Sequence, residues 1–149
     1  MSTFNHQTNL EFLKELYLLN CEDGEFYKQN SVIRRRILIK VFFERLAAQK
    51  NSFCNAIKIL ILSRIDSHER DTTCFDIQFK DINTLIFKLY KKECLQECKK
   101  REMNALKTYN QILEKTEDEE IKTSLAPHVE EIQLILREMR VMGVDKYLI

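Results

Sequence analysis

Glycine and proline are nearly absent from this chain, which has two glycines and one proline in 149 residues. Sheet proteins need these residues at their many tight turns, whereas a helical bundle has few turns and folds without them. A charged fraction of 32% and a hydrophobic fraction of 44% are typical of a globular chain and not of a disordered one. The length suits a single core. We therefore predict one all-α domain over residues 1–149.

Apolar residues recur every three to four positions in four segments of the chain, which is the period of an amphipathic helix. The stretch between the second and third segments, residues 66–80, is polar and lacks this period, so we expect a connector there. The predicted helices cover residues 8–29, 31–65, 81–115 and 117–142.

Polar residues that favour turns and caps set these boundaries. Asn30 and Ser31 separate the first two predicted helices, and Asp81 can cap the third. Thr116 with Glu119 forms a capping box, in which each side chain bonds the backbone N–H of the other residue. The last helix is therefore predicted to begin at this pair.

Gly24 lies on the apolar stripe of the first predicted helix, with Tyr17 and Cys21 before it and Tyr27 after it. Inside a helix a glycine costs roughly 1 kcal/mol relative to alanine. A glycine on the buried stripe therefore indicates that a neighbouring helix or a bulky side chain approaches closely. The alternative is a helix that ends at Asn20, followed by a turn that contains the glycine.

Very short connections join the first helix to the second and the third to the fourth, so each pair is expected to form an antiparallel hairpin. The connector of about fifteen residues between the pairs reaches roughly 50 Å when extended, enough to run the length of a bundle. We therefore predict a ferritin-like four-helix bundle, made of two antiparallel hairpins joined by a long crossover. An open pair of hairpins fits the same pattern.

The net charge of +1 gives no global field that would attract nucleic acid or a membrane. Basic clusters at 34–36 and 99–101 are each followed closely by acidic residues, which is typical of a solvated helix face. The longest aliphatic run, residues 57–63, is too short to span a bilayer. We therefore expect neither a nucleic-acid partner nor a membrane partner.

The five cysteines have no framework spacing, and their odd number favours reduced thiols in a cytoplasmic protein. Cys94 and Cys98 lie four positions apart on one helical face, a spacing that a soft metal could bridge. Because no second pair of ligands lies nearby in the sequence, buried free thiols are the preferred interpretation.

Polar side chains interrupt the predicted apolar stripes. A carboxylate in a core needs a hydrogen-bond donor, a metal or solvent, so these positions predict either a buried hydrogen-bond network or a metal site. The predicted network consists of Tyr27, Gln49, Glu102, Tyr109 and His128. The predicted metal ligands are Glu102, His128, Gln49 and Glu25, and iron or manganese is the metal that they would take.

The di-iron pattern of helical bundles is incomplete in this chain. Such centres take Glu from two helices and Glu-x-x-His from the other two. The sequence has no Glu-x-x-His, and Leu125 stands three positions before His128. A structural network without a cofactor is therefore the preferred interpretation of these core positions, and a mononuclear metal site is the alternative.

Short motifs in both halves of the chain carry a family resemblance. In the first half, LKELYLLNCEDGEFYK is followed by FFERLAAQKNSFCNAIK, with an Asp-Gly before a Tyr and an Ala-x-Gln before a Phe. In the second half, ECLQECKKREMNALKTYNQIL is rich in acids. Over residues 8–142 these motifs resemble a ferritin-like family of unknown function, found in bacterial proteins linked to general stress responses. That family usually has Gln where this chain has His128, and Gly where it has Arg101.

The resemblance implies a four-helix ferritin-like fold made of two related hairpins. Tyr27 and Tyr109 are 82 positions apart, and so are Ile39 and Ile121, which is a faint internal repeat. The fold would also explain Gly24 as a packing glycine. The resemblance brings no established reaction.

Three functions fit these observations. The preferred one is a non-enzymatic, ferritin-like stress-associated or interaction protein that forms a homo-dimer, because the sequence offers no nucleophile paired with a base. The second is a metal-binding oxidoreductase, which could hold a di-iron centre, or a metal-handling protein. The third is a helical adaptor, which would bind another protein through a large apolar patch outside the core.

Overall fold

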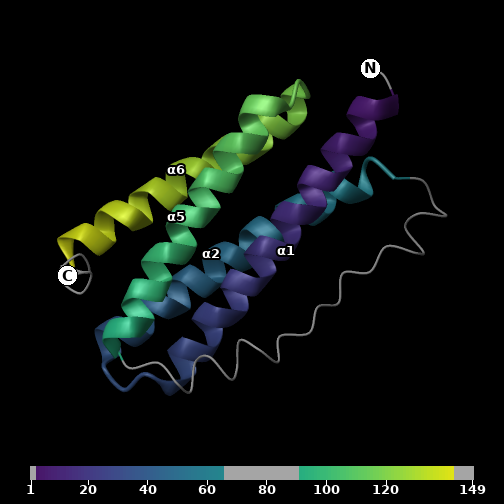
Figure 1. Cartoon of the computed structure of the whole chain (residues 1–149). Helices are drawn as coiled ribbons and strands as arrows, with labels where there is room; N and C mark the ends of the chain where they lie inside the picture. The colour runs from purple at the N-terminus through teal and green to yellow at the C-terminus, as the bar shows by residue number, and fades with distance from the viewer. Residues whose placement is uncertain (1–2, 66–90, 143–149) are drawn as a thin grey trace. The chain divides into compact units, whose positions relative to one another are not determined.

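The computed structural model describes residues 3–65 and 91–142, and every regular element in these two ranges is an α-helix (Figure 1). The helices of this part are α1 (Thr3–Ile33), α2 (Ile37–Leu62), α5 (Lys91–Lys115) and α6 (Glu119–Val141). The predicted all-α class is therefore confirmed for the described part of the chain. The predicted connector 66–80 and the predicted cap at Asp81 lie outside it.

The helices pair into two compact units, residues 1–80 and 81–149. In the first unit α1 packs against α2, and in the second α5 packs against α6. Three residues separate the helices of each pair, 34–36 in the first and 116–118 in the second. A connection this short makes the two helices antiparallel neighbours, so the two predicted hairpins are confirmed.

The two hairpins make their turns at equivalent residues. α1 ends at Ile33, and α5 ends 82 positions later at Lys115. The same offset separates the start of α2 at Ile37 from the start of α6 at Glu119. Both tyrosines of the sequence repeat are fully buried. The internal repeat therefore extends from the sequence to the helix boundaries at the two turns.

The predicted break at Asn30 and Ser31 is wrong, because α1 continues to Ile33. Asn30 Nδ2 donates a hydrogen bond of 2.9 Å to the Phe26 carbonyl oxygen, and Ser31 Oγ donates one of 2.6 Å to the Lys28 carbonyl oxygen. Both side chains therefore bond to the preceding turn of their own helix and do not end it.

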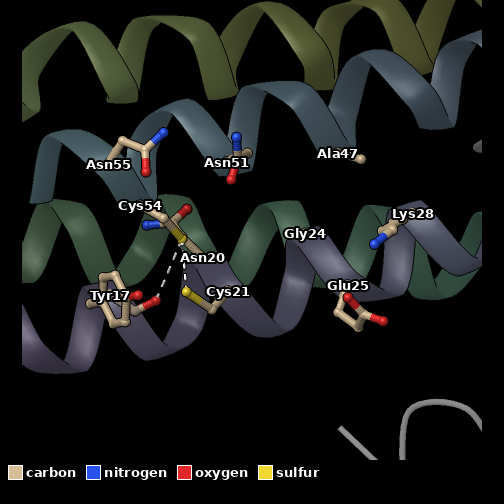
Figure 2. A pocket seen from close by; sticks show the side chains of 10 residues that line it. All are labelled: Tyr17, Asn20, Cys21, Gly24, Glu25, Lys28, Ala47, Asn51, Cys54 and Asn55. Atoms are coloured by element: carbon tan, nitrogen blue, oxygen red, sulfur yellow. Dashed lines mark hydrogen bonds between the residues drawn. The ribbon is translucent and has the colours of Figure 1, made fainter. Parts of the chain in front are cut away.

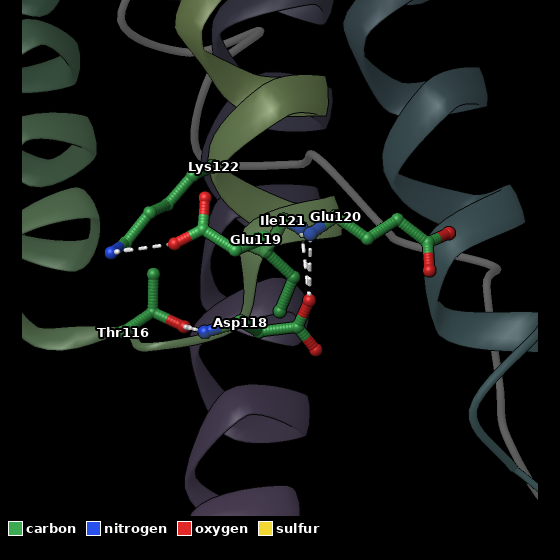
Figure 3. A network of polar contacts seen from close by, with 6 residues as sticks. All are labelled: Thr116, Asp118, Glu119, Glu120, Ile121 and Lys122. Atoms are coloured by element: carbon green, nitrogen blue, oxygen red, sulfur yellow. Dashed lines mark hydrogen bonds and ion pairs between the residues drawn. The ribbon is translucent and has the colours of Figure 1, made fainter.

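α6 begins two residues later than predicted, with Asp118 as its N-cap (Figure 3). Asp118 Oδ1 accepts hydrogen bonds from the backbone N–H groups of Glu120 and Ile121, at 3.0 and 3.2 Å. Thr116 Oγ1 accepts a bond of 3.2 Å from the Asp118 N–H, so it supports the turn before the cap. The predicted capping box of Thr116 with Glu119 is therefore wrong.

The buried face of α1 is displaced slightly from its predicted stripe. Leu16, Asn20 and Asp23 are buried, whereas Tyr17 and Cys21 are half-buried. Side chains one position apart on a helix point about 100° apart, so the rotation of α1 against α2 decides which of two adjacent positions is buried. Tyr17, Cys21 and Gly24 of the predicted stripe lie at the edge of the buried face, where they border a pocket described below, whereas Tyr27 is fully buried as predicted.

Candidate functional site

The buried polar side chains of the second hairpin come from both of its helices. Glu102 and Tyr109 lie on α5, seven positions apart, and both are fully buried; His128 of α6 is buried as well. Tyr109 Oη and His128 Nδ1 are 2.8 Å apart, which is a hydrogen bond, and the two rings meet edge to face. This bond is one contact of the predicted polar network. Whether Glu102 takes part in that network stays a prediction.

The predicted metal ligands are divided between the two hairpins. Glu25 is half-buried on α1, where its Oε1 accepts a hydrogen bond of 2.8 Å from Gln29 Nε2. Gln49 is half-buried on α2, whereas Glu102 and His128 belong to the second hairpin. Among the residues that the structure describes, no three His, Cys, Asp or Glu side chains gather into a set that could hold a metal ion. Metal binding stays a prediction.

α1 is continuous through Gly24, and α2 approaches it closely there. A Cβ atom built on Gly24 would lie 3.2 Å from the Cβ atom of Lys50, which is tighter than an ordinary contact between side chains. The predicted packing role of this glycine is therefore confirmed, and the alternative of a turn at this point is wrong.

Lys50 and Asp23 are charged residues that are buried in the first hairpin, although the sequence did not predict it. The Lys50 Nζ atom lies 5.4 Å from the centre of the Phe53 ring, within the range of a cation–π contact. Position 50 continues the three-to-four spacing of Leu46, Phe53 and Ile57 on the buried face of α2. The helical spacing of α2 therefore favours burial of Lys50, but lysine is usually exposed, and for that reason its burial was not predicted.

A pocket of about 450 Å³ lies between α1 and α2, and we call it the thiol pocket (Figure 2). Cys21 and Cys54 point toward one another from the two helices, with their sulfur atoms 2.9 Å apart. Cys54 Sγ also donates a hydrogen bond of 3.8 Å to the carbonyl oxygen of Tyr17. The residues that line the pocket are Tyr17, Asn20, Cys21, Gly24, Glu25, Lys28, Ala47, Asn51, Cys54 and Asn55.

The two thiols differ in exposure and in acidity. Cys21 is half-buried and Cys54 is buried. The hydrogen bond with Cys54 lowers the pKa of Cys21, because it stabilises the thiolate, and burial opposes this effect only in part. The same bond raises the pKa of Cys54, and burial and the charge of Cys21 raise it further, while the nearby Lys50 acts in the opposite direction. Cys21 is therefore the thiol of the pair that ionises first.

The turn of the first hairpin carries exposed aliphatic and basic side chains together, and we call residues 32–41 the basic tip. Val32, Ile37 and Leu38 are 68%, 74% and 84% exposed. Four basic side chains and no acidic one occur in this segment. The basic cluster 34–36 therefore lies in a turn beside exposed aliphatic side chains, and not on the solvated helix face that its sequence predicted.

The equivalent residues of the second hairpin, 114–123, carry the opposite charge, and we call them the acidic tip (Figure 3). They hold five carboxylates and two lysines. Asp118 caps α6, and Glu119 pairs with Lys122 at 3.4 Å on the surface, where such a pair contributes little stability. The other carboxylates of the tip are exposed. The two tips thus occupy equivalent positions of the repeat and differ in the sign of their charge.

None of the helices in the two described ranges combines the length and the apolar character that crossing a membrane requires. The ferritin-like resemblance stays a prediction. Comparison of this chain with protein-family models, with curated proteins and with solved structures finds no match.

Proposed function

We propose that this chain is a non-enzymatic interaction protein that associates with a second copy of itself through the basic tip. The observation that carries the proposal is the exposure of aliphatic side chains there. Val32, Ile37 and Leu38 are all exposed within one turn, and clustered exposed apolar side chains mark surfaces that bind a partner. The arginines of the same turn favour a partner with negative charge.

Charge selects the acidic tip of the second copy as the partner surface. Two basic tips would repel one another, whereas the acidic tip offers five carboxylates on a segment of similar size. Every copy carries one tip of each sign, so a twofold dimer would contain the contact twice. This is the homo-dimer that we propose.

The internal repeat supports a second part of the proposal, a ferritin-like four-helix bundle. Two hairpins whose turns fall at equivalent residues are the parts from which such a bundle is made. The polar side chains that are buried in each hairpin, among them Lys50 and Glu102, would then serve the packing of the bundle and not a reaction.

Sedimentation velocity tests the association, and we expect the wild type to form dimers at low ionic strength. R35E/R36E reverses two exposed charges of the basic tip, and E114K/E117K reverses two of the acidic tip. Each variant should weaken dimerisation by roughly tenfold or more, because charge pairs across the contact are lost. E114K places a cation at the C-terminal end of α5, which the helix dipole tolerates well.

An equimolar mixture of the two variants separates association between copies from a contact within one copy. R35E/R36E keeps an unchanged acidic tip and E114K/E117K keeps an unchanged basic tip, so the mixture should form dimers more readily than either variant alone. The matched control is K14E/K107E, which changes the net charge as much as R35E/R36E does, at exposed positions outside both tips. It should dimerise like the wild type.

Three results would overturn the proposal. The first is a wild type that stays monomeric at every concentration tested, and the second is a dimer that neither charge reversal weakens. The third is binding of the wild-type monomer to vesicles that contain phosphatidylserine, with loss of binding in R35E/R36E. In that case a membrane surface, and not a second copy, would be the partner of the basic tip.

A further inference from the structure

We propose that Cys21 and Cys54 form a reactive dithiol that exchanges with small disulfides of the glutathione type. Cys21 is the attacking thiol and Cys54 is the resolving thiol. The site is the thiol pocket between α1 and α2. It shares no residue with either tip, so this inference does not depend on the proposed association.

The two sulfur atoms are already close to bonding distance. Their separation is 2.9 Å, whereas a disulfide bond requires about 2.05 Å. Cys21 lies on α1 and Cys54 on α2, and the two helices pack against one another in one compact unit. A small movement of two side chains therefore suffices to join them, with no rearrangement of a loop.

The difference in exposure between the two thiols indicates which one attacks and which one resolves. Both cysteines line the pocket, but Cys21 is half-buried and Cys54 is buried, so an incoming disulfide reaches the sulfur of Cys21 first. Cys54 is 7% exposed, and its sulfur contacts that of Cys21. When Cys21 ionises, the Cys54 S–H can donate to its sulfur instead of to the Tyr17 carbonyl oxygen, and this hydrogen bond stabilises the thiolate form of Cys21, which is the species that attacks in disulfide exchange.

The exchange takes two steps, and the small disulfide is its oxidant. In the first step the Cys21 thiolate attacks one sulfur of the small disulfide, whose S–S bond breaks, and one small thiolate leaves. In the second step the sulfur of Cys54 attacks the sulfur of Cys21, and the other small thiolate leaves. The two protein thiols lose two electrons and become one disulfide. The small disulfide gains the electrons, and the two thiol protons end on the two released thiols.

The thiol pocket suits a small polar peptide disulfide. Its volume of about 450 Å³ lies within the range of sites that hold small molecules. In Figure 2, Glu25 and Lys28 of α1 lie toward one end, and Asn51 and Asn55 extend along α2. Glutathione carries carboxylates, an ammonium group and amides, for which a lysine, a carboxylate and side-chain amides are matching partners.

Incubation of the reduced full-length chain with glutathione disulfide, followed by tryptic peptide mapping, tests the site. We expect a disulfide between the peptides of Cys21 and Cys54. It should form roughly tenfold or more faster than any glutathione adduct on the peptide of Cys94 and Cys98, which are buried on α5. The tryptic peptides are 15–28 with Cys21, 51–58 with Cys54, and 93–99 with Cys94 and Cys98.

Two variants separate the roles, and a third is the matched control. Cys54→Ser cannot resolve the mixed disulfide, so it should accumulate one glutathione on Cys21. Cys21→Ser lacks the attacking thiol, so it should form no adduct on Cys54 in the same time. Cys98→Ser removes a buried thiol of the other hairpin and should form the disulfide of Cys21 and Cys54 as fast as the wild type.

The peptide map of the wild type tests the proposed site even if a variant fails to fold. A wild type in which peptides 15–28 and 51–58 do not become linked would overturn the proposal, and so would a faster adduct on peptide 93–99. Accumulation of glutathione on Cys54 in Cys21→Ser, at the rate seen on Cys21 in Cys54→Ser, would overturn the assignment of the two roles.

Discussion

Of the four cysteines that the structure describes, Cys21 is half-buried and Cys54, Cys94 and Cys98 are buried, so a reagent in solution reaches Cys21 more readily than those three. The reactivity of a thiol depends on its ionised fraction as well as on access. The hydrogen bond with Cys54 lowers the pKa of Cys21 and thereby raises that fraction near neutral pH. Access and ionisation therefore favour the same sulfur atom.

The pH dependence of alkylation measures this effect directly. We expect the rate at which iodoacetamide modifies Cys21 to reach half of its limit below pH 9.0, the reference pKa of a thiol, because the thiolate forms at lower pH. Cys54→Ala removes the hydrogen bond, so the half-point should move to higher pH. The mass of peptide 15–28 follows the reaction in both proteins. An unchanged half-point in Cys54→Ala would show that this bond does not set the acidity of Cys21.

The hydrogen bond of Tyr109 with His128 should contribute measurably to stability, because both residues are buried. Tyr109→Phe removes the hydroxyl and should lower the free energy of unfolding by about 1–2 kcal/mol. His128→Gln keeps a polar side chain at the other end of the bond and should cost less. Urea denaturation of the three proteins gives both values. Equal losses in the two variants would contradict this account.

The starts of α2 and α6 occupy equivalent positions in the two hairpins and can be compared directly. The caps Arg36 and Asp118 have similar backbones, with φ and ψ of −71° and 120° in α2 and of −75° and 110° in α6. Asp118 accepts two hydrogen bonds from α6, whereas the Arg36 side chain makes no cap bond to the described residues of α2. Asp118→Ala should therefore lower the free energy of unfolding by about 1 kcal/mol.

Arg36→Ala is the control for that measurement. It truncates the equivalent cap without removing a cap bond, so its expected cost is at most a few tenths of a kcal/mol. Chemical denaturation of both variants under one condition gives the comparison. If Arg36→Ala cost as much as Asp118→Ala, the cap bonds would not be the cause of the loss.

The close approach of α1 and α2 at Gly24 can be tested with a single methyl group. Gly24→Ala gains about 1 kcal/mol of helix propensity but overpacks the contact, which typically costs about 1–3 kcal/mol. The Cβ atom of Lys50 is fixed to the α2 backbone and cannot swing away, so we expect a net loss of about 1 kcal/mol. Ser52→Ala, at an exposed position of α2, should instead raise the free energy of unfolding by a few tenths of a kcal/mol. If both variants were more stable than the wild type, α2 would have to move away from α1 to accommodate the added methyl group at position 24.

The pairing of the helices and the end of α5 at Lys115 could be predicted from the sequence, but the end of α1 and the starts of α2 and α6 could not. Apolar residues with the helical period, separated by very short connections, leave an antiparallel hairpin as the simplest fold of each half. The ends depend on individual hydrogen bonds. Asn30 and Ser31 have the composition of a break, yet they bond carbonyl groups of α1, and Asp118 takes the capping role predicted for Thr116.

The candidate sites were only partly visible in the sequence. The burial of Glu102 and His128 could be predicted, because each interrupts an otherwise apolar stripe. Lys50 lies on such a stripe too, but an isolated lysine is expected at a surface. The pair of Cys21 and Cys54 has no motif, since 33 positions separate the two residues and their contact depends on how α1 and α2 are rotated against one another.

For the whole molecule, a net charge of +1 conceals two charged surfaces of opposite sign. The basic tip holds four cations, and the acidic tip holds five carboxylates and two lysines, so their charges nearly cancel in the total. Net charge therefore predicts little about association in this chain, because the relevant quantity is the charge of each tip. The aliphatic side chains of the basic tip add an apolar contribution that salt does not screen.

The response of the proposed dimer to salt separates these two contributions. The screening length falls from about 10 Å at 0.1 M to about 3 Å at 1 M ionic strength, so attraction between the tips should weaken as salt is added. We expect the dissociation constant of the wild type to rise roughly tenfold over that range, and that of K14E/K107E to follow it. R35E/R36E should respond far less, because its basic tip has lost half of its cations. Sedimentation velocity across a sodium chloride series gives the three slopes. Dimerisation that strengthens with salt in the wild type would instead assign the contact to the aliphatic side chains, with charge opposing it.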